Sequence, residues 1–133
     1  MIKATDIHKS YGALEVLRGV SLEVSRGEVV SIVGASGAGK TTLLRCLAGL
    51  TRERAGTVAV DGAPVAARRR PGLVHLVMQE PGYQLFADSA RAELHRESDE
   101  AADAMLAAFG LAACAERHPL ALSGGERQRL AVA

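Results

Sequence analysis

A glycine-rich segment between an apolar run and a helical pattern constrains the fold of this chain more than any other feature. Residues 34–41 read GASGAGKT, a glycine followed by four spacers and then Gly-Lys-Thr. The preceding residues 28–34, EVVSIVG, have the β-branched composition of a strand buried on both faces. The following residues 42–50, TLLRCLAGL, have the apolar spacing of a helix. This order of strand, loop and helix predicts an α/β fold with a phosphate-binding loop.

The residue types in the loop suit a polyphosphate and Mg²⁺. Glycines let the backbone curve so that several N–H groups point inward, and the helix that begins near Lys40 adds its positive end. Lys40 can reach the outer phosphates as a point charge, and Thr41 offers a hydroxyl to Mg²⁺. A glycine-rich turn without a ligand is the alternative, but it leaves the Lys-Thr pair in this context unexplained. The sequence therefore predicts nucleoside triphosphate binding through Gly34, Ser36, Gly37, Gly39, Lys40, Thr41 and Thr42.

Short alternating elements surround this loop. Strands are predicted over residues 2–12, 16–27, 57–62 and 72–79. The first two strands end in turns at Gly12 and Gly27, and the third ends in an Asp-Gly turn. From Ser89 onward, alanine and leucine recur at helical spacing. The pattern predicts a mostly parallel α/β core with an inserted helical segment.

Composition excludes several classes of protein. With 16 basic and 15 acidic side chains among 133 residues, the chain gives no reason to expect a nucleic-acid partner. No run approaches the roughly 18 apolar residues of a membrane span, so a link to a membrane is expected to come through a partner. Cys46 and Cys114 lack metal-ligand spacing and are predicted to be buried thiols in a reducing compartment. The basic run at residues 67–71 is predicted to be a solvated loop.

A second glycine motif lies near the end of the chain, where residues 122–129 read LSGGERQR. Ser123, Gly124 and Gly125 are predicted to form a helix N-terminus whose free N–H groups and hydroxyl suit a phosphate. An ordinary N-cap at Ser123 is compatible with this interpretation but does not explain the glycines. The motif resembles the signature of the nucleotide-binding domains of ABC transporters. That resemblance implies a P-loop NTPase (RecA-like) core, N-terminal antiparallel strands, an inserted helical segment and a sheet that is incomplete at its C-terminal end.

The resemblance also implies partners and further site residues. Two such domains stack head to tail, as a homodimer or a heterodimer, and each signature closes on the ATP held by the other domain's loop. Tyr11 resembles the aromatic residue that stacks on adenine, although a tyrosine before a glycine is also ordinary turn chemistry. Gln79 resembles the glutamine that contacts Mg²⁺ and the attacking water, which would make it catalytic together with Lys40. The cofactors implied are ATP and Mg²⁺.

The stretch after Gln79 is similar to the ATPase subunits of energy-coupling factor importers. Residues 84–86 read QLF and residues 93–94 read EL, which is the order seen in that subfamily, although Gly82 and Tyr83 depart from its usual more acidic pair. Leu85 and Phe86 would be costly in a loop unless a helix of a transmembrane subunit covered them. The alternative is that both pack into the protein's own core. The expected location is peripheral, on the cytoplasmic face of the cell membrane.

The family pattern continues beyond the signature helix with an Asp-Glu strand end and a switch histidine, and neither can be placed in residues 1–133. We therefore expect one domain cut after the signature, with a β and phosphate-loop part at about 1–79 and a helical part at 80–133. We also expect the isolated chain to be marginally stable or to aggregate. Two functions stay open at this point. The chain is either the front of an ATP-hydrolysing transporter subunit or a nucleotide-binding module without turnover.

Overall fold

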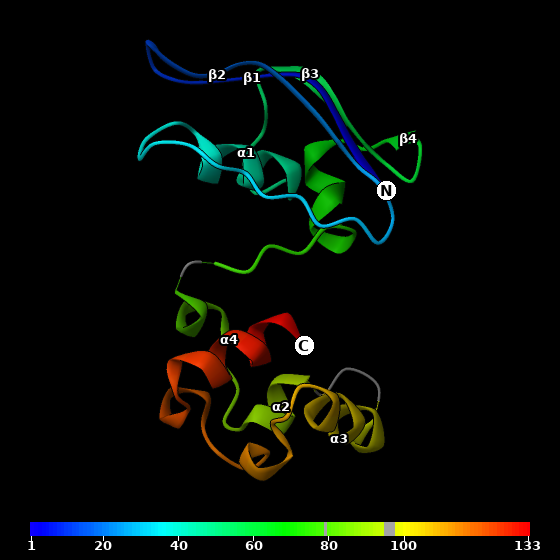
Figure 1. Ribbon diagram of the computed structural model, residues 1–133, viewed down its shortest axis with the longest axis vertical. Coiled ribbons are helices and arrows are strands. Elements are labelled where there is room, and N and C mark those ends of the chain that lie inside the picture. The colour runs from blue at the N-terminus through cyan, green and yellow to red at the C-terminus, as the bar shows by residue number, and fades with distance from the viewer. Residues whose placement is uncertain (79, 95–97) are drawn as a thin grey trace. The chain divides into compact units, whose positions relative to one another are not determined.

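The computed structural model describes residues 1–78, 80–94 and 98–133, which form two compact units. The first unit is Met1–Leu76 and the second is Val77–Ala133 (Figure 1). The first carries the sheet and the phosphate loop, and the second is helical. None of the helices in the described ranges is long and apolar enough to cross a membrane.

The sheet of the first unit has four strands in the order β2-β1-β3-β4, and every neighbouring pair is antiparallel. The strands are β1 (Ile2–Tyr11), β2 (Leu14–Val24), β3 (Ala55–Val60) and β4 (Ala63–Pro64). Two predicted turns are confirmed. Gly12, with φ 59°, lies in the link between β1 and β2, and Asp61 and Gly62, with φ 48° and 83°, link β3 to β4. Both central residues of this second turn have positive φ, as a type I′ hairpin requires.

Helix α1 (Lys40–Leu47) packs against this sheet and completes the core of the first unit (Figure 1). The buried residues of that core are Ala4, Ile7, Leu17, Leu43, Cys46, Leu47 and Val58. The helix contributes residues three and four apart, which is the spacing of one helical face. Strand residues supply the rest, and Ala4 and Ile7 of β1 are three positions apart because the pairing register shifts between them.

Two predicted strands are wrong. Residues 28–35 adopt no regular structure, and Val29 and Val33 are 94% and 91% exposed. The described part of the other run, residues 72–78, also forms no strand, and Leu73 is 57% exposed. A strand that is apolar on both faces needs neighbouring strands to pair with its backbone. Among residues 1–78, 80–94 and 98–133, no strand pairs with either run, so the described sheet is antiparallel and not mostly parallel.

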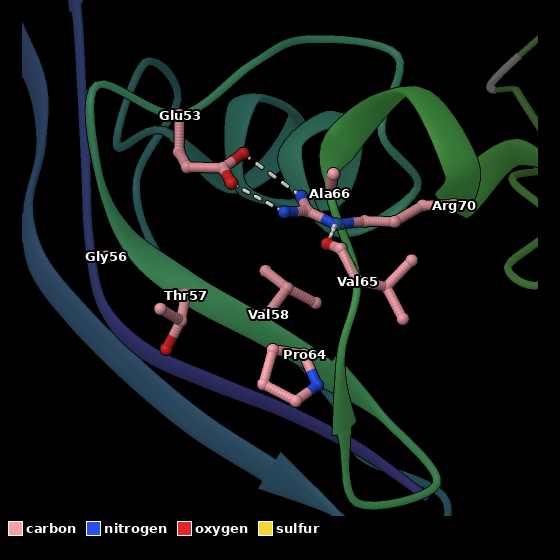
Figure 2. A pocket seen from close by; sticks show the side chains of 8 residues that line it. All are labelled: Glu53, Gly56, Thr57, Val58, Pro64, Val65, Ala66 and Arg70. Atoms are coloured by element: carbon pink, nitrogen blue, oxygen red, sulfur yellow. Dashed lines mark hydrogen bonds and ion pairs between the residues drawn. The ribbon is translucent and has the colours of Figure 1, made fainter.

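A buried arginine ties the end of α1 to the chain that follows it. Arg70 lies in the 3₁₀ helix Ala67–Gly72 and is 1% exposed. Its guanidinium donates to both carboxylate oxygens of Glu53, at 3.0 and 2.5 Å (Figure 2). It also donates to Cys46 O at 2.6 Å and to Val65 O at 2.8 Å. The predicted solvated loop is therefore wrong at Arg70, although Arg68 and Arg69 are exposed.

The described residues of the second unit form three α-helices and short 3₁₀ turns. The helices are α2 (Ala90–Leu94), α3 (Asp99–Ala108) and α4 (Gly124–Val132), and the turns are Pro81–Gln84, Ala112–Cys114 and Pro119–Ala121. Ser98 caps α3 by accepting a hydrogen bond from Ala101 N–H at 3.2 Å. The core contains Leu85, Ala90, Leu106, Leu111, Cys114, Ala115, Leu122 and Leu130. Helical spacing after Ser89 thus predicts α2 and α3 correctly.

Candidate nucleotide site

The phosphate loop is closed by its own lysine. Lys40 Nζ donates to the carbonyl oxygens of Gly34 and Ala35, both at 2.7 Å, so the ammonium reaches back over the loop to its start. The loop is also held by a turn in which Ala38 N–H donates to Ala35 O at 3.2 Å. The Lys40 side chain thus closes the loop onto its own first two residues. A cation held at this position suits an anion of several phosphates.

Two glycines give the loop its path. Gly37 and Gly39 have φ of 80° and 90°, where a side chain is strained. At Gly39 there is a second constraint, because a methyl group would lie 3.1 Å from Leu17 Cδ2 and 3.1 Å from Val16 Cγ1. At Gly37 nothing lies within 4 Å of such a methyl group. Gly39 is therefore favoured by close packing against β2 as well as by backbone conformation.

The positive end of the α1 dipole has no acidic or capping side chain in its own first turn. Its N-cap residue is Gly39, no side chain caps it, and no acidic residue lies in its first turn. The first N–H groups of a helix have no partner inside the helix and carry the positive end of its dipole. Thr41, in this first turn, is exposed, while Thr42 is half-buried. The donors present fit a polyphosphate, and the Thr41 hydroxyl is of the type that binds Mg²⁺ beside phosphates.

Tyr11 ends β1 at the tip of the first hairpin and is 49% exposed. The hairpin brings it toward the loop. Lys9 pairs with Leu17 across the strands, and Leu17 is one of the residues in contact range of Gly39. Tyr11 lies two residues beyond that pair, or about 7 Å along the strand. Its ring is therefore partly open to solvent.

The signature residues belong to the second unit and begin α4. Ser123 is the N-cap, and a capping box joins it to Glu126. Ser123 N–H donates to Glu126 Oε2 at 2.7 Å, and Glu126 N–H donates to Ser123 Oγ at 3.4 Å. Gly124 and Gly125 are exposed, and in the part of the chain that is described no acceptor is recorded for their N–H groups. These two N–H groups are the donors left for an external anion.

Glu126 is held in its charged form by this network. Hydrogen bonds from the side chain of Ser123, then from its backbone, then from Cys114 lower the pKa of Glu126 from 4.5 to about 2. The Cys114 thiol donates to Glu126 Oε1 at 3.4 Å. Burial first, and this hydrogen bond second, raise the pKa of Cys114, so the thiol keeps its proton. The spacing Ser-x-x-Glu signals a capping box in the sequence, whereas Cys114 gives no sequence signal for its contact.

The remaining predicted residues have different outcomes. Gln79 lies outside the described residues. Leu85 is 6% exposed and belongs to the core, so the alternative that it packs inside its own unit is correct for this residue. Phe86 is 83% exposed and Tyr83 is 75% exposed. Glu93 accepts hydrogen bonds from the N–H groups of Phe86 and Ala87, both at 2.8 Å, which fixes the loop that presents Phe86.

A pocket of about 220 Å³ in the first unit is not part of this site (Figure 2). It lies between β3, β4 and the Glu53–Arg70 pair, and none of the predicted site residues that the structure describes lines it. Every nitrogen of the Arg70 guanidinium already has an acceptor. The pocket therefore contains no charged group that lacks a partner.

Comparisons with known proteins agree with these two motifs. The family model described as "ABC transporter" matches residues 17–133. A putative ABC transporter ATP-binding protein of Treponema denticola is 46% identical over 132 residues, which are 96% of this chain and 27% of that protein. The lipoprotein-releasing system ATP-binding protein LolD of Bacteroides thetaiotaomicron is 42% identical over 149 residues, covering 100% of this chain and 68% of that protein.

Solved structures show the same fold. CbiO1 from Clostridium perfringens, part of the ABC transporter complex cbiONQ, superposes with a TM-score of 0.83 at 24% identity, covering 98% of this chain and 59% of that one. The ATP-binding cassette MJ0796, solved as a dimer bound to ADP and Pi, has a TM-score of 0.81 at 26% identity and covers 99% and 67%. This chain thus spans from about a quarter to about two thirds of the length of these proteins. The α/β fold is that of P-loop NTPases, and the chain belongs to the ABC transporter family, as part of its ATP-binding domain.

Proposed function

We propose that this chain binds Mg-ATP through the loop at residues 34–41 and that it is part of a subunit that couples ATP binding and hydrolysis to membrane transport. The observation that carries the proposal is the closed loop, in which the Lys40 ammonium stands beside an α1 N-terminus without an acidic residue. This arrangement concentrates positive charge where a triphosphate would lie. ABC ATPases bind ATP with Mg²⁺, and the two relatives above are named as ATP-binding proteins.

Each loop residue has a role in this proposal. Lys40 binds the outer phosphates, and the backbone N–H groups from Gly34 to Gly39, including Ser36 and Gly37, surround them. Thr41 would hold Mg²⁺ together with Gln79, and the ion would neutralise charge on the phosphates. Thr42, half-buried on α1, supports the same turn of the helix. Tyr11 stacks on adenine, for which its half-exposed ring is suited.

The signature needs a second nucleotide, since the loop of the same chain already takes one. Gly124 and Gly125 offer exposed N–H groups at the start of α4, and Ser123 offers its hydroxyl if a phosphate replaces Glu126 as its partner. We therefore place a second ABC ATP-binding domain against these residues, head to tail. The division of the domain into residues 1–79 and 80–133 is part of the same proposal.

The favoured subclass is the energy-coupling factor type of importer, docked on the cytoplasmic face of the membrane. Its support is the segment from Tyr83 to Phe86, where two large apolar side chains are exposed while Leu85 anchors the loop in the core. An exposed pair held on a fixed loop suits a helix of a transmembrane subunit. One relative above is named for a lipoprotein-releasing system and the other only as an ABC transporter protein, so the exposed segment and not these relatives supports the subclass.

The test is to measure Mg-ATP binding and turnover side by side for the wild-type chain, Lys40→Ala and Arg45→Ala. Arg45 is exposed in the last turn of the same helix and serves as the matched control, because it carries the same type of charge away from the loop. We expect binding to be lost in Lys40→Ala and kept in Arg45→Ala. Equal binding by all three proteins would contradict the proposal. Lys40-dependent hydrolysis would favour the ATPase, and binding without hydrolysis would favour the nucleotide-binding module.

A further inference from the structure

A lysine of the first hairpin faces the ring of Tyr11. Lys9 Nζ lies over that ring, 5.1 Å from its centroid. The two residues are two apart on β1, so both side chains are on one face of the strand. An ammonium within about 6 Å of a ring centroid is attracted by the negative face of the ring. One face of the Tyr11 ring is therefore occupied by a cation from the same chain.

The position of this cation is fixed by the backbone near α1. Lys9 Nζ donates to the carbonyl oxygen of Arg52 at 2.8 Å, in the segment that connects α1 to β3. The strand itself is joined to the same segment, because Arg54 N–H donates to His8 O at 2.7 Å. Lys9 thus has one contact that anchors it and a second that orients the ring.

The same strand position is linked to the phosphate loop. Lys9 pairs with Leu17 in β2, and a methyl group on Gly39 would lie 3.1 Å from Leu17 Cδ2. The strand that carries Tyr11 is therefore connected to Gly39 of the loop through this residue pair, and Lys9 covers one face of the Tyr11 ring. A base stacked on this ring would be held at a fixed distance from phosphates bound at Lys40.

We propose that Lys9 is a positioning residue for the nucleotide base, which holds the Tyr11 ring so that a purine stacks on the face opposite the ammonium. The inference rests on the function proposed above, and it adds that base recognition depends on a residue that does not touch the base. Without the ammonium, the ring is free to turn and both of its faces are open to water. Part of the stacking is then lost to the ordering of the ring.

The test compares a ligand that has a base with one that lacks it. Equilibrium binding of Mg-ATP and of Mg-tripolyphosphate is measured for the wild-type chain, Lys9→Met, Lys9→Arg and Lys3→Met. Lys9→Met keeps an apolar stem without charge, and Lys9→Arg restores a cation and a donor. Lys3→Met is the matched control, because it removes an exposed lysine of the same strand whose partner is Glu23.

We expect Lys9→Met to weaken Mg-ATP binding about two- to five-fold, as the loss of one cation–π contact implies, and to leave tripolyphosphate binding unchanged. Lys9→Arg should recover most of the loss, and Lys3→Met should show none. An unchanged affinity of Lys9→Met for Mg-ATP would overturn the inference. So would an equal loss for both ligands, because that would mean a general effect on the loop.

Tyrosine fluorescence gives a second measurement. The chain has no tryptophan and two tyrosines, so in a Tyr83→Phe background Tyr11 is the only tyrosine. Quenching by Mg-ATP is expected with Lys9 and should be smaller with Lys9→Met at saturating ligand. Equal quenching would overturn the inference while leaving Lys40-dependent binding intact. Failure of the wild-type chain to bind either ligand would instead overturn the proposed function, and the role of Lys9 with it.

Discussion

Removing the charge of Glu53 should destabilise the first unit strongly. In Glu53→Gln the Arg70 guanidinium, 1% exposed, loses its only anionic partner among the described residues. Burial acts to raise the pKa of Glu53, but the hydrogen bond and charge of Arg70 outweigh it and lower the pKa. The pair is therefore ionised near neutral pH. Breaking a buried ion pair from one side costs about 3–5 kcal/mol, since the remaining charge stays buried without compensation.

The cost of the reverse change can be worked out from the same contacts. Arg70→Met removes the charge and leaves Val65 O without its donor, at about 1 kcal/mol, whereas Cys46 O keeps a hydrogen bond from Gly49 N–H at 3.0 Å and should lose less. It also leaves the Glu53 carboxylate without its cation. In the double variant, Glu53→Gln with Arg70→Met, no buried charge remains and only the two carbonyl losses persist. We expect the double variant to lose about 1–2 kcal/mol, less than Glu53→Gln alone.

Urea denaturation followed by circular dichroism measures these differences. With a slope of about 1–3 kcal/mol per molar urea, Glu53→Gln should lower the midpoint by about 1 M or more. Glu23→Gln is the control, because its partner Lys3 is 52% exposed and such pairs contribute about 0.2–1 kcal/mol. If Glu53→Gln shifted the midpoint no more than Glu23→Gln, or if the double variant lost the sum of the single losses, this reasoning would be refuted. A Glu53→Gln chain already unfolded without urea should regain a transition in the double variant.

Two further predictions concern the two glycine motifs. Gly37→Ala and Gly39→Ala both place a side chain at positive φ, which costs about 1–2 kcal/mol each, but only Gly39→Ala also crowds Val16. In thermal melts Gly39→Ala should therefore lose more stability than Gly37→Ala. Equal losses would contradict the packing argument. For Glu126, the folded-state pKa of about 2 lies below the ordinary 4.5. The contribution of its charge to folding stability is therefore complete above about pH 4.5 and is lost as the pH falls toward 2. The difference in melting temperature between the wild-type chain and Glu126→Gln should therefore shrink over that range, and a constant difference would show that the Ser123 network does not hold the charge.

The sequence predicts the local elements well because their signals are local. The antiparallel hairpins follow from alternating strands and from the turn residues Gly12, Asp61 and Gly62, whose backbone conformations few other residues adopt. Helices α2 and α3 follow from the spacing of alanine and leucine after Ser89, whereas the cap of α3 at Ser98 is seen only in the structure. Each of these elements forms from its own residues and one neighbour.

Burial is harder to predict because it depends on residues far along the chain. The apolar runs at 28–34 and 72–78 have the composition of central strands, yet a central strand exists only where strands pair on both sides. Arg70 looks like one of three solvated arginines, and only the placement of Glu53, 17 residues away, makes its burial possible. Leu85 and Phe86 are adjacent and equally apolar, but the core accepts only Leu85.

In the candidate site, too, local features can be predicted from the sequence and long-range contacts cannot. The identities of the loop and signature residues can be recognised from their order, since the chemistry of phosphate binding restricts the residue types. The partners of those residues cannot be recognised in this way. Lys9 and Cys114 carry no motif. The contact of Lys9 with Tyr11 arises from the side-chain alternation of one strand and from the anchor at Arg52, and that of Cys114 with Glu126 arises from core packing. The roles of Tyr11, Gln79 and Ser123 toward a nucleotide stay predictions.

Both glycine motifs already contain an internal substitute for their ligand. The Lys40 ammonium donates hydrogen bonds to two backbone carbonyl oxygens, and Ser123 N–H donates a hydrogen bond to the Glu126 carboxylate. Ligand capture is then a replacement reaction, in which an incoming phosphate displaces oxygens of the protein itself. The binding free energy from these donors is therefore the difference between their hydrogen bonds to the phosphate and their hydrogen bonds to the displaced protein oxygens. Such a difference favours a highly charged polyphosphate over small anions that are only marginally better acceptors than the groups they displace.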